Sequence, residues 1–216
     1  MTADNRTQIV DFLKHRGTNI VGFCEIPEKT EIIEIEEAFP RAIVFGYSLS
    51  GAVLRTIKDR PTLLYKHHYK TVNWMLDQTG FRLAHFIEEL GKRALAVPAS
   101  QTVDWEEQKG HVSHKSFAVA AGLGHAGRNG LVIHPEFGAQ VRYASVLTDL
   151  EFSPDARATG TCGDCQKCIN TCPANAITSA GVDLARCLDK LREFSSIRGI
   201  GQFICGVCVK ACNGRR

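Results

Sequence analysis

Hydrophobic residues recur along the chain with helical spacing in some segments and in short continuous runs in others. Between Pro61 and Leu90 an apolar side chain returns every three or four positions, which is typical of an amphipathic helix. This segment is predicted to form one long helix, or two helices that break at Gly80. The same spacing predicts shorter helices in residues 7–15 and 113–122.

Short apolar runs, bounded by polar residues, glycine or proline, lie between these helices. They predict strands in NIVGFCEI (19–26), RAIVFGYSL (41–49), ALAVPA (94–99), GLVIHP (130–135) and VRYASVLTDL (141–150). Because helices and strands alternate, we expect the α/β (or α+β) class with a mixed sheet. The segment EFSPDARATGT, residues 151–161, has no periodic pattern and is predicted to be a linker.

Composition restricts where the protein acts. A hydrophobic fraction of 44% and a charged fraction of 23% are those of a soluble globular protein. The polar N-terminus lacks the features of a signal peptide, and no apolar run reaches the length of a membrane span. We therefore expect a cytoplasmic protein that does not bind membranes. The net charge of +3 does not by itself argue for a nucleic-acid partner.

The cysteines divide the chain into two parts. Of nine cysteines, Cys24 stands alone and the other eight lie between residues 162 and 212. Since the cytosol keeps thiols reduced, these cysteines need a role other than disulfides. We expect an α/β cofactor or substrate domain in residues 1–150 and a small cysteine-rich domain in residues 151–216.

Residues 162–173 read CGDCQKCINTCP, which is C-x2-C-x2-C-x3-C-P, the spacing of bacterial ferredoxins. Two-residue gaps let one tight loop bring three thiolates around a four-iron cluster, and the fourth cysteine of such a run binds a second cluster. Pro173 fits the first position of a short helix in PANAIT, residues 173–178.

The other cysteines that two clusters require lie farther along the chain. CGVCVKAC at residues 205–212 gives C-x2-C-x3-C, and Cys187 in LARCLDKL supplies the missing member. The crossed pattern predicts two [4Fe-4S] clusters, one on Cys162, Cys165, Cys168 and Cys212 and one on Cys172, Cys187, Cys205 and Cys208. A structural zinc site and a disulfide framework are weaker alternatives. Cys24 is expected to be a buried core thiol.

A glycine pattern precedes the cysteines. Gly122, Gly124 and Gly127 match G-x-G-x-x-G, the fingerprint of a dinucleotide-binding turn. That turn must follow a strand and open a helix, so that the pyrophosphate meets the helix N-terminus. Here the glycines follow a predicted helix and open a predicted strand. We therefore do not expect a nicotinamide or flavin dinucleotide site of this type.

The segment AGLGHAGRNGLVIHPEFGAQVRYASVLTDLEF, followed by both cysteine sets and the cysteine in LARCLDKL, resembles the epoxyqueuosine reductases and the related reductive dehalogenases. The resemblance covers residues 112–212 well and residues 1–111 loosely. VPASQ followed by SHK looks like a short-chain branch of that family. The resemblance implies a nitroreductase-like, corrinoid-binding domain followed by a ferredoxin-like domain that passes single electrons to cobalamin.

The resemblance also implies candidate cofactor residues. The flat corrin would rest on a glycine-rich surface, since glycine permits close backbone approach; by position this surface comprises Gly122, Gly124, Gly127, Asn129 and Gly130. His125 lies among these glycines and is a further candidate. His114 and Lys115 are candidates for an anionic group of the cofactor or substrate, and a first helical turn capped by Ser113 is the simpler alternative.

Two features depart from the epoxyqueuosine reductases. Those enzymes carry an aspartate proton donor where this chain has Val97–Ser100. Asp104 is the candidate catalytic substitute, and a solvated loop carboxylate is the alternative. Those enzymes also continue into helical repeats that help to hold tRNA, whereas this sequence ends at Arg216. On that basis we do not expect tRNA as a partner.

Two function classes follow. The first is an iron–sulfur oxidoreductase that relays electrons through two [4Fe-4S] clusters to cobalamin or to a substrate in residues 1–150, fed by a reduced ferredoxin or flavodoxin. The second is an electron-transfer module that reduces a partner, such as a corrinoid protein, without small-molecule catalysis of its own. A flavin bound in the same fold is a third possibility. Cobalt content, visible absorption and fluorescence distinguish the three.

Overall fold

The computed structural model describes residues 4–28 and 30–214, which group into two compact units. The first, here called the sheet unit, comprises Met1–Tyr47, Asn73–Leu123 and Arg142–Thr159. The second, the cysteine unit, comprises Ser48–Val72, Gly124–Val141 and Gly160–Arg216. Each unit is therefore assembled from three separate stretches of chain. The simple division at residue 150 stays a prediction.

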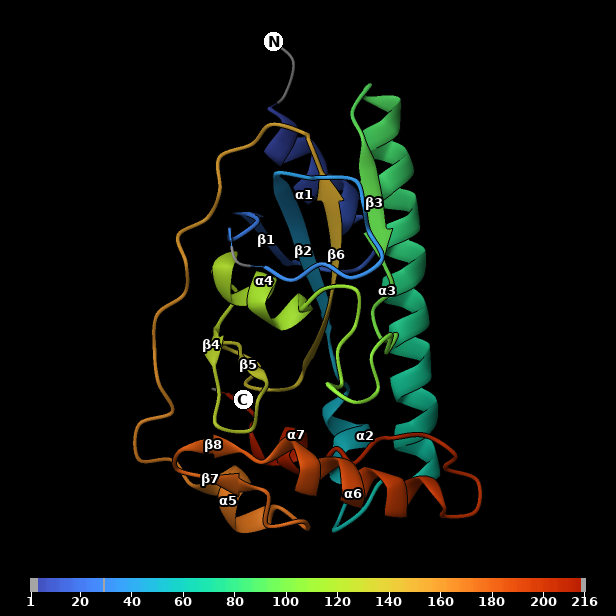
Figure 1. Cartoon of the computed structure of the whole chain (residues 1–216), viewed down its shortest axis with the longest axis vertical. Coiled ribbons are helices and arrows are strands. Elements are labelled where there is room, and N and C mark those ends of the chain that lie inside the picture. Colours follow the sequence, from blue (N-terminus) through green and yellow to red (C-terminus); the bar gives the residue numbers. More distant parts are fainter. Residues whose placement is uncertain (1–3, 29, 215–216) are drawn as a thin grey trace. The chain divides into compact units, whose positions relative to one another are not determined.

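The sheet unit is built on a four-stranded sheet in the order β1-β2-β6-β3. The strands are β1 (Ile20–Glu25), β2 (Arg41–Ser48), β3 (Ala94–Val97) and β6 (Val141–Thr148). β1 pairs antiparallel with β2, and β3 pairs antiparallel with β6. β2 and β6 also run in opposite directions (Figure 1). The α/β class is confirmed. The sheet is antiparallel where a mixed sheet was expected, because no helical crossover places two neighbouring strands in parallel.

Three helices follow the predicted hydrophobic spacing. α1 (Asn5–Lys14) begins after Asp4, whose carboxylate accepts hydrogen bonds from the first free backbone N–H groups. α3 (Leu63–Glu89) is one continuous helix of 27 residues, so no break occurs at Gly80. α4 (His114–Ala120) begins after Ser113, whose hydroxyl accepts a hydrogen bond from the Ser116 N–H. The predicted Ser113 cap is therefore confirmed.

Two glycines explain how α3 and α4 approach the sheet. A methyl group on Gly80 of α3 would meet Phe45, Ala96 and Val146 at 3.5 to 3.9 Å, which is ordinary contact. A methyl group on Gly22 of β1 would stand 2.4 Å from the Ala121 carbonyl oxygen, directly after α4. The sheet therefore accepts α4 at this point only because residue 22 has no Cβ.

The difference in space around Gly22 and Gly80 predicts that replacement by alanine has opposite effects on stability at the two positions. Gly22→Ala should lower the free energy of unfolding by about 1–3 kcal/mol, because the backbone of α4 must move away from β1. Gly80→Ala should raise it by about 0.5–1 kcal/mol, because alanine is favoured within a helix and finds room here. Urea unfolding followed by circular dichroism measures both. Equal effects of the two substitutions would contradict the close approach at Gly22.

The predicted linker lies along the sheet unit. The Asp155 N–H donates to the Phe23 carbonyl at 2.8 Å, and the Asp155 carboxylate accepts from the Phe23 N–H at 2.9 Å. The same carboxylate forms an ion pair with Arg6. The segment has no regular secondary structure, as expected, yet backbone and side-chain hydrogen bonds fix it to β1.

Apart from the first turns of α3, the cysteine unit consists of short elements. They are α2 (Gly51–Arg55), α5 (Lys167–Thr171), α6 (Leu184–Ser195), α7 (Val207–Ala211) and the hairpins β4 (His125–Ala126) with β5 (Val132–Ile133) and β7 (Ile177–Thr178) with β8 (Gly181–Val182). Within the described residues, no helix has both the length and the apolar character needed to cross a membrane.

The predicted helix in PANAIT is wrong. The short helix α5 comes before Cys172 rather than after it. Asn175 then takes a left-handed conformation with φ of 48°, which a helix does not allow. The Ala176 N–H points to the Cys172 sulfur at 3.4 Å. The chain therefore turns around this thiol and continues directly into β7.

Candidate functional site

A cavity in the cysteine unit brings together four thiols. Its lining includes Cys172 after α5, Cys187 on α6, Cys205 before α7 and Cys208 on α7. The rest of the lining is mainly apolar and includes Pro173, Ala174, Ile177, Val182 and Leu191. Thiols from three separate chain segments thus surround one space. These four cysteines are the set that the crossed ferredoxin pattern groups together.

The other four thiols are also neighbours. Burial raises the pKa of Cys212, and the nearby thiols Cys162, Cys168 and Cys165 raise it further. The pKa of Cys168 is likewise raised, first by burial and then by Cys162. The last cysteine of the chain therefore lies close to the loop that carries the first three. The crossed ferredoxin pattern predicts this proximity although about 45 residues separate Cys212 from the loop.

Glycines shape both cysteine loops. Gly163, between Cys162 and Cys165, has φ of 51°, and Gly206, between Cys205 and Cys208, has φ of 83°. Left-handed backbone costs an L-residue free energy that glycine does not pay. The position next to the first cysteine is therefore glycine in both C-G-x-C loops because the chain must turn there.

The residues fit four-iron clusters better than single ions. Among residues 4–28 and 30–214, no three His, Cys, Asp or Glu side chains converge tightly enough to hold one metal ion; the thiols instead surround a cavity. Burial raises the pKa of Cys205 to about 11 and of Cys208 to about 12. A buried thiolate needs compensating positive charge, which iron in a cluster supplies. The assignment of all eight ligands stays a prediction.

Cys24 lies apart from this chemistry. Its side chain is buried in β1, and burial, followed by the charge of Asp155, raises its pKa to about 12. Its expected role as a core thiol is confirmed.

The predicted glycine surface faces the chain itself. A Cβ on Gly122 would stand 2.8 Å from the Ala156 carbonyl, and one on Gly124 would stand 2.4 Å from the Ile133 carbonyl. Gly127 packs against the Ile133 side chain and Gly130 against Val182. Close approach within the chain thus accounts for the absence of a Cβ at these positions. A contribution to corrin binding stays a prediction. The glycines end α4 and enter the β4–β5 hairpin, which confirms the predicted order of helix before strand.

The polar residues of the same stretch meet the cysteine loops. The Arg128 guanidinium donates hydrogen bonds to the Cys165 and Gly163 carbonyls. Asn129 lines the cavity of the second cysteine set and is 8% exposed. His125 on β4 has a buried Nε2 without a hydrogen-bond partner. Asn129 and His125 were predicted from the sequence to bind a cofactor. The contact of Arg128 with the first cysteine loop was not predicted, because no motif marks this residue.

His114 in the sheet unit has both ring nitrogens engaged. Nδ1 lies 2.9 Å from the Ser145 hydroxyl, and Nε2 lies 2.9 Å from the Pro98 carbonyl. Since the carbonyl only accepts, Nε2 carries the proton. Burial lowers the pKa of His114, and the Pro98 carbonyl opposes that shift. Asp77 accepts a hydrogen bond from the Ala99 N–H at 2.8 Å, so α3 and α4 together fix the loop after β3.

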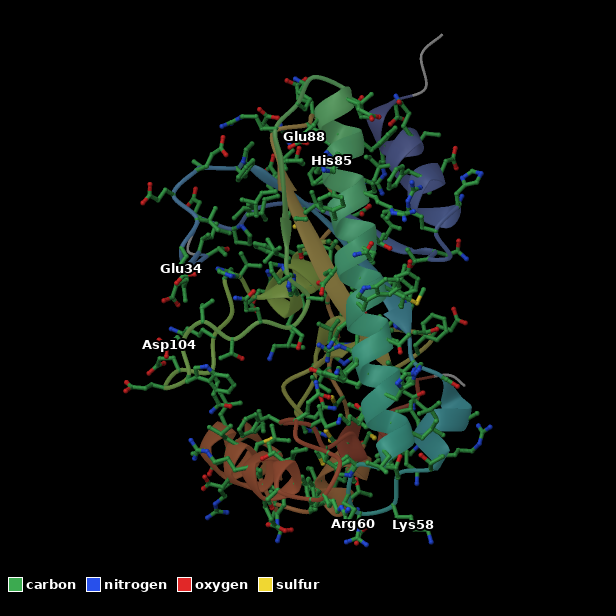
Figure 2. The ribbon with its side chains drawn as sticks, turned by 90° about the vertical axis from the view of Figure 1, so that its right-hand side faces the viewer. Glu34, Lys58, Arg60, His85, Glu88 and Asp104 are labelled. Carbon is green, nitrogen blue, oxygen red and sulfur yellow. The ribbon has the colours of Figure 1, made fainter. Side chains whose placement is uncertain are left out.

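Lys115 and Asp104 occupy exposed or half-exposed positions. Lys115 lies on the first turn of α4 and is exposed. The Asp104 carboxylate accepts hydrogen bonds from the Glu106 and Glu107 N–H groups, both at 2.9 Å. Figure 2 shows Asp104 on a loop that projects from the sheet unit. These contacts explain the carboxylate as a turn residue, and its role as proton donor stays a prediction.

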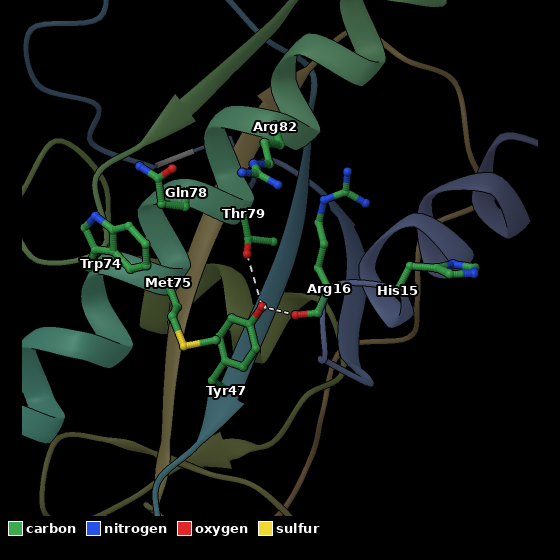
Figure 3. A pocket seen from close by; sticks show the side chains of 8 residues that line it. All are labelled: His15, Arg16, Tyr47, Trp74, Met75, Gln78, Thr79 and Arg82. Carbon is green, nitrogen blue, oxygen red and sulfur yellow. Dashed lines mark hydrogen bonds between the residues drawn. The ribbon is translucent and has the colours of Figure 1, made fainter.

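The sheet unit contains a pocket that was not predicted from the sequence. It is lined by His15, Arg16, Tyr47, Trp74, Met75, Gln78, Thr79 and Arg82 (Figure 3). The Tyr47 hydroxyl donates to the Arg16 carbonyl at 2.6 Å and lies 3.1 Å from the Thr79 hydroxyl. Burial, and then the charge of Arg82, lowers the pKa of Arg16. Within the described ranges neither arginine is ion-paired with a carboxylate, so the pocket suits an anionic group.

The chain is similar to known reductases. No family model matches it. It is 31% identical to an epoxyqueuosine reductase of Staphylococcus aureus over 156 residues, which covers 70% of this chain and 39% of that protein. It is 54% identical over 65 residues to a tetrachloroethene reductive dehalogenase of Desulfitobacterium hafniense, covering 28% of this chain and 12% of that protein. A catabolic reductive dehalogenase structure matches 98% of this chain and 32% of its own, with a TM-score of 0.77 at 20% identity.

The chain belongs to the epoxyqueuosine reductase and reductive dehalogenase-like family. It spans well under two thirds of the length of these relatives. The family predicted from the glycine stretch and the cysteine pattern is confirmed.

The expectation that tRNA is not a partner is wrong for this family. An epoxyqueuosine reductase has been solved with an epoxyqueuosine-modified tRNA-Tyr stem loop, and this chain matches that structure over 97% of its own length with a TM-score of 0.65 at 19% identity. The absence of helical repeats was a poor argument, since it rested on where this sequence ends.

His114 gives a testable pH dependence. The folded protein favours the neutral imidazole, so the stability from His114 is complete above the unfolded pKa of 6.5 and is lost as pH falls through the lower folded pKa. His114→Gln should cost about 1–2 kcal/mol at neutral pH and should flatten the fall in stability below pH 6.5. Thermal unfolding across pH measures this, with His15→Gln as the exposed control. An unchanged pH profile in His114→Gln would contradict the assignment.

Proposed function

We propose that the chain is an iron–sulfur oxidoreductase of the corrinoid type that passes single electrons through two [4Fe-4S] clusters to a corrinoid or to the substrate. The observation that carries the proposal is the cavity on which Cys172, Cys187, Cys205 and Cys208 converge from three segments. The proximity of Cys212 to the first cysteine loop supports a second centre. Two neighbouring iron–sulfur clusters would transfer electrons rather than chemical groups, which favours a redox role.

Family membership supports the substrate class. The relatives that cover most of this chain are named epoxyqueuosine reductases, so an epoxyqueuosine-bearing tRNA stem loop is the first substrate to test. Reducing an epoxide to an alkene consumes two electrons and two protons and releases water. A halogenated organic compound is the second substrate class, because other relatives are named reductive dehalogenases.

A bound corrinoid would supply low-valent cobalt as the nucleophile or reductant. The described residues give this cofactor less support than the clusters. The Cβ positions of the glycines proposed for the corrin point at the chain itself, and the pocket with Arg16 and Arg82 suits only an anionic portion of a ligand. For this reason the electron-transfer module, which reduces a partner without binding cobalt, remains the second candidate function.

Metal content tests the cluster assignment. Protein reconstituted without oxygen should hold about eight irons per chain. Cys187→Ala and Cys212→Ala should each reduce this to about four, because each removes a ligand of a different cluster. Cys24→Ala serves as the control and should keep about eight. Iron analysis with electron paramagnetic resonance (EPR) of the dithionite-reduced protein gives the result. Zinc in place of iron would overturn the proposal.

A cobalamin titration separates the two candidate functions. The oxidoreductase predicts saturable binding, seen as a change in the cobalamin absorption spectrum, and dithionite-driven loss of the epoxide from a modified tRNA stem loop. The electron-transfer module predicts reducible clusters with no cobalamin binding and no turnover of either substrate class. Full iron with no cobalamin binding would therefore reject the corrinoid part alone.

A further inference from the structure

The β4–β5 hairpin presents an unused hydrogen-bond donor to the cysteine cavity. Asn129 is 8% exposed, and its Nδ2 is buried without a hydrogen-bond partner. The same residue lines the cavity together with Cys172, Cys187, Cys205 and Cys208. A buried N–H group without an acceptor costs free energy, and a cluster in the cavity that Asn129 lines would offer an acceptor.

The orientation of the Asn129 amide is fixed by its neighbours. Its Oδ1 accepts a hydrogen bond from the Leu131 N–H at 3.2 Å. Only the oxygen can accept from that donor, so the amide nitrogen is left without a partner within the hairpin. Gly127 packs directly against the Asn129 oxygen, and Gly130 has φ of 70°. The hydrogen bond from the Leu131 N–H therefore sets the orientation of the Asn129 amide.

The other side chain of the lining that could donate through nitrogen is already partnered. Lys190 lines the same space, but its ammonium group forms an ion pair with Glu193. The remaining lining residues are cysteines or apolar residues. Asn129 therefore provides the lining side-chain donor that has no partner among the described residues.

We propose that the Asn129 side-chain N–H donates a hydrogen bond to a sulfur of the cluster held by Cys172, Cys187, Cys205 and Cys208, and thereby raises the reduction potential of that cluster. This inference rests on the proposed function, because it requires the cluster. Cluster and thiolate sulfurs are acceptors, and they become more negative when the cluster takes up one electron. A fixed donor stabilises the reduced form more than the oxidised form.

The test is an EPR-monitored redox titration of reconstituted protein, with dithionite as the one-electron reductant. Asn129→Leu keeps a similar volume but has no donor. We expect one of the two reduction waves to move to lower potential, with the equilibrium constant for reduction lowered up to about tenfold, or about 59 mV for one electron. Asn129→Asp should lower the same wave further, because it adds a negative charge. Asn170→Leu, at an exposed position of α5 in the same unit, should leave both waves in place.

Each outcome decides the inference. If the unsubstituted protein lacked clusters, the proposed function would fail first. If Asn129→Leu held full iron with both waves unmoved, or moved upward, the hydrogen bond would be disproved. If Asn129→Leu lost iron, the hydrogen bond would be tested in the unsubstituted protein instead. Its asparagines would carry 15N in the side-chain amide. Pulsed EPR should then detect 15N coupled to a reduced cluster, and its absence would overturn the inference.

Discussion

The desolvation of the cysteine thiols is the constraint on which the cysteine unit depends. Thiols prefer to stay protonated when buried, as the raised pKa values of Cys205 and Cys208 show. As ligands of the proposed clusters they must lose that proton. Positive charge from iron, donors aimed at sulfur and close packing of the surrounding chain are then needed together. The short helices and turns of the unit contribute little regular structure of their own, so this packing determines their arrangement.

Glycine makes the close packing possible. The C-G-x-C loops turn at Gly163 and Gly206 in left-handed conformations. A methyl group on Gly206 would also stand 2.6 Å from the Tyr65 ring. Residues with a Cβ would thus push the second loop away from the residues beneath it. The glycines of the 122–130 stretch serve the same purpose, since each lets one part of the chain touch another.

Local patterns in the sequence predicted most elements. Apolar periodicity identified α1, α3 and α4, and continuous apolar runs identified β1, β2, β3 and β6, because both signals depend on nearby residues. The family followed from the cysteine spacing. The direction of the central strands, the turn at Asn175 and the pocket around Arg16 and Arg82 were not predictable, because they depend on contacts between distant segments. The glycine stretch was predicted to matter, but whether glycines face a ligand or their own chain is not encoded in their spacing.

The two polar residues at the tip of the β4–β5 hairpin connect both cysteine sets. Arg128 holds the backbone of the first loop through the Cys165 and Gly163 carbonyls, while Asn129 turns toward the cavity of the second set. The two sets adjoin, since Cys168 of the first contributes to the raised pKa of Cys208 of the second. Electrons moving between neighbouring clusters follow the difference between their potentials. The hairpin thus holds one loop by its backbone and, in the proposed arrangement, offers a side-chain donor to the cluster of the other set. Such a difference would separate the potentials of the two clusters, as a directed transfer of electrons requires.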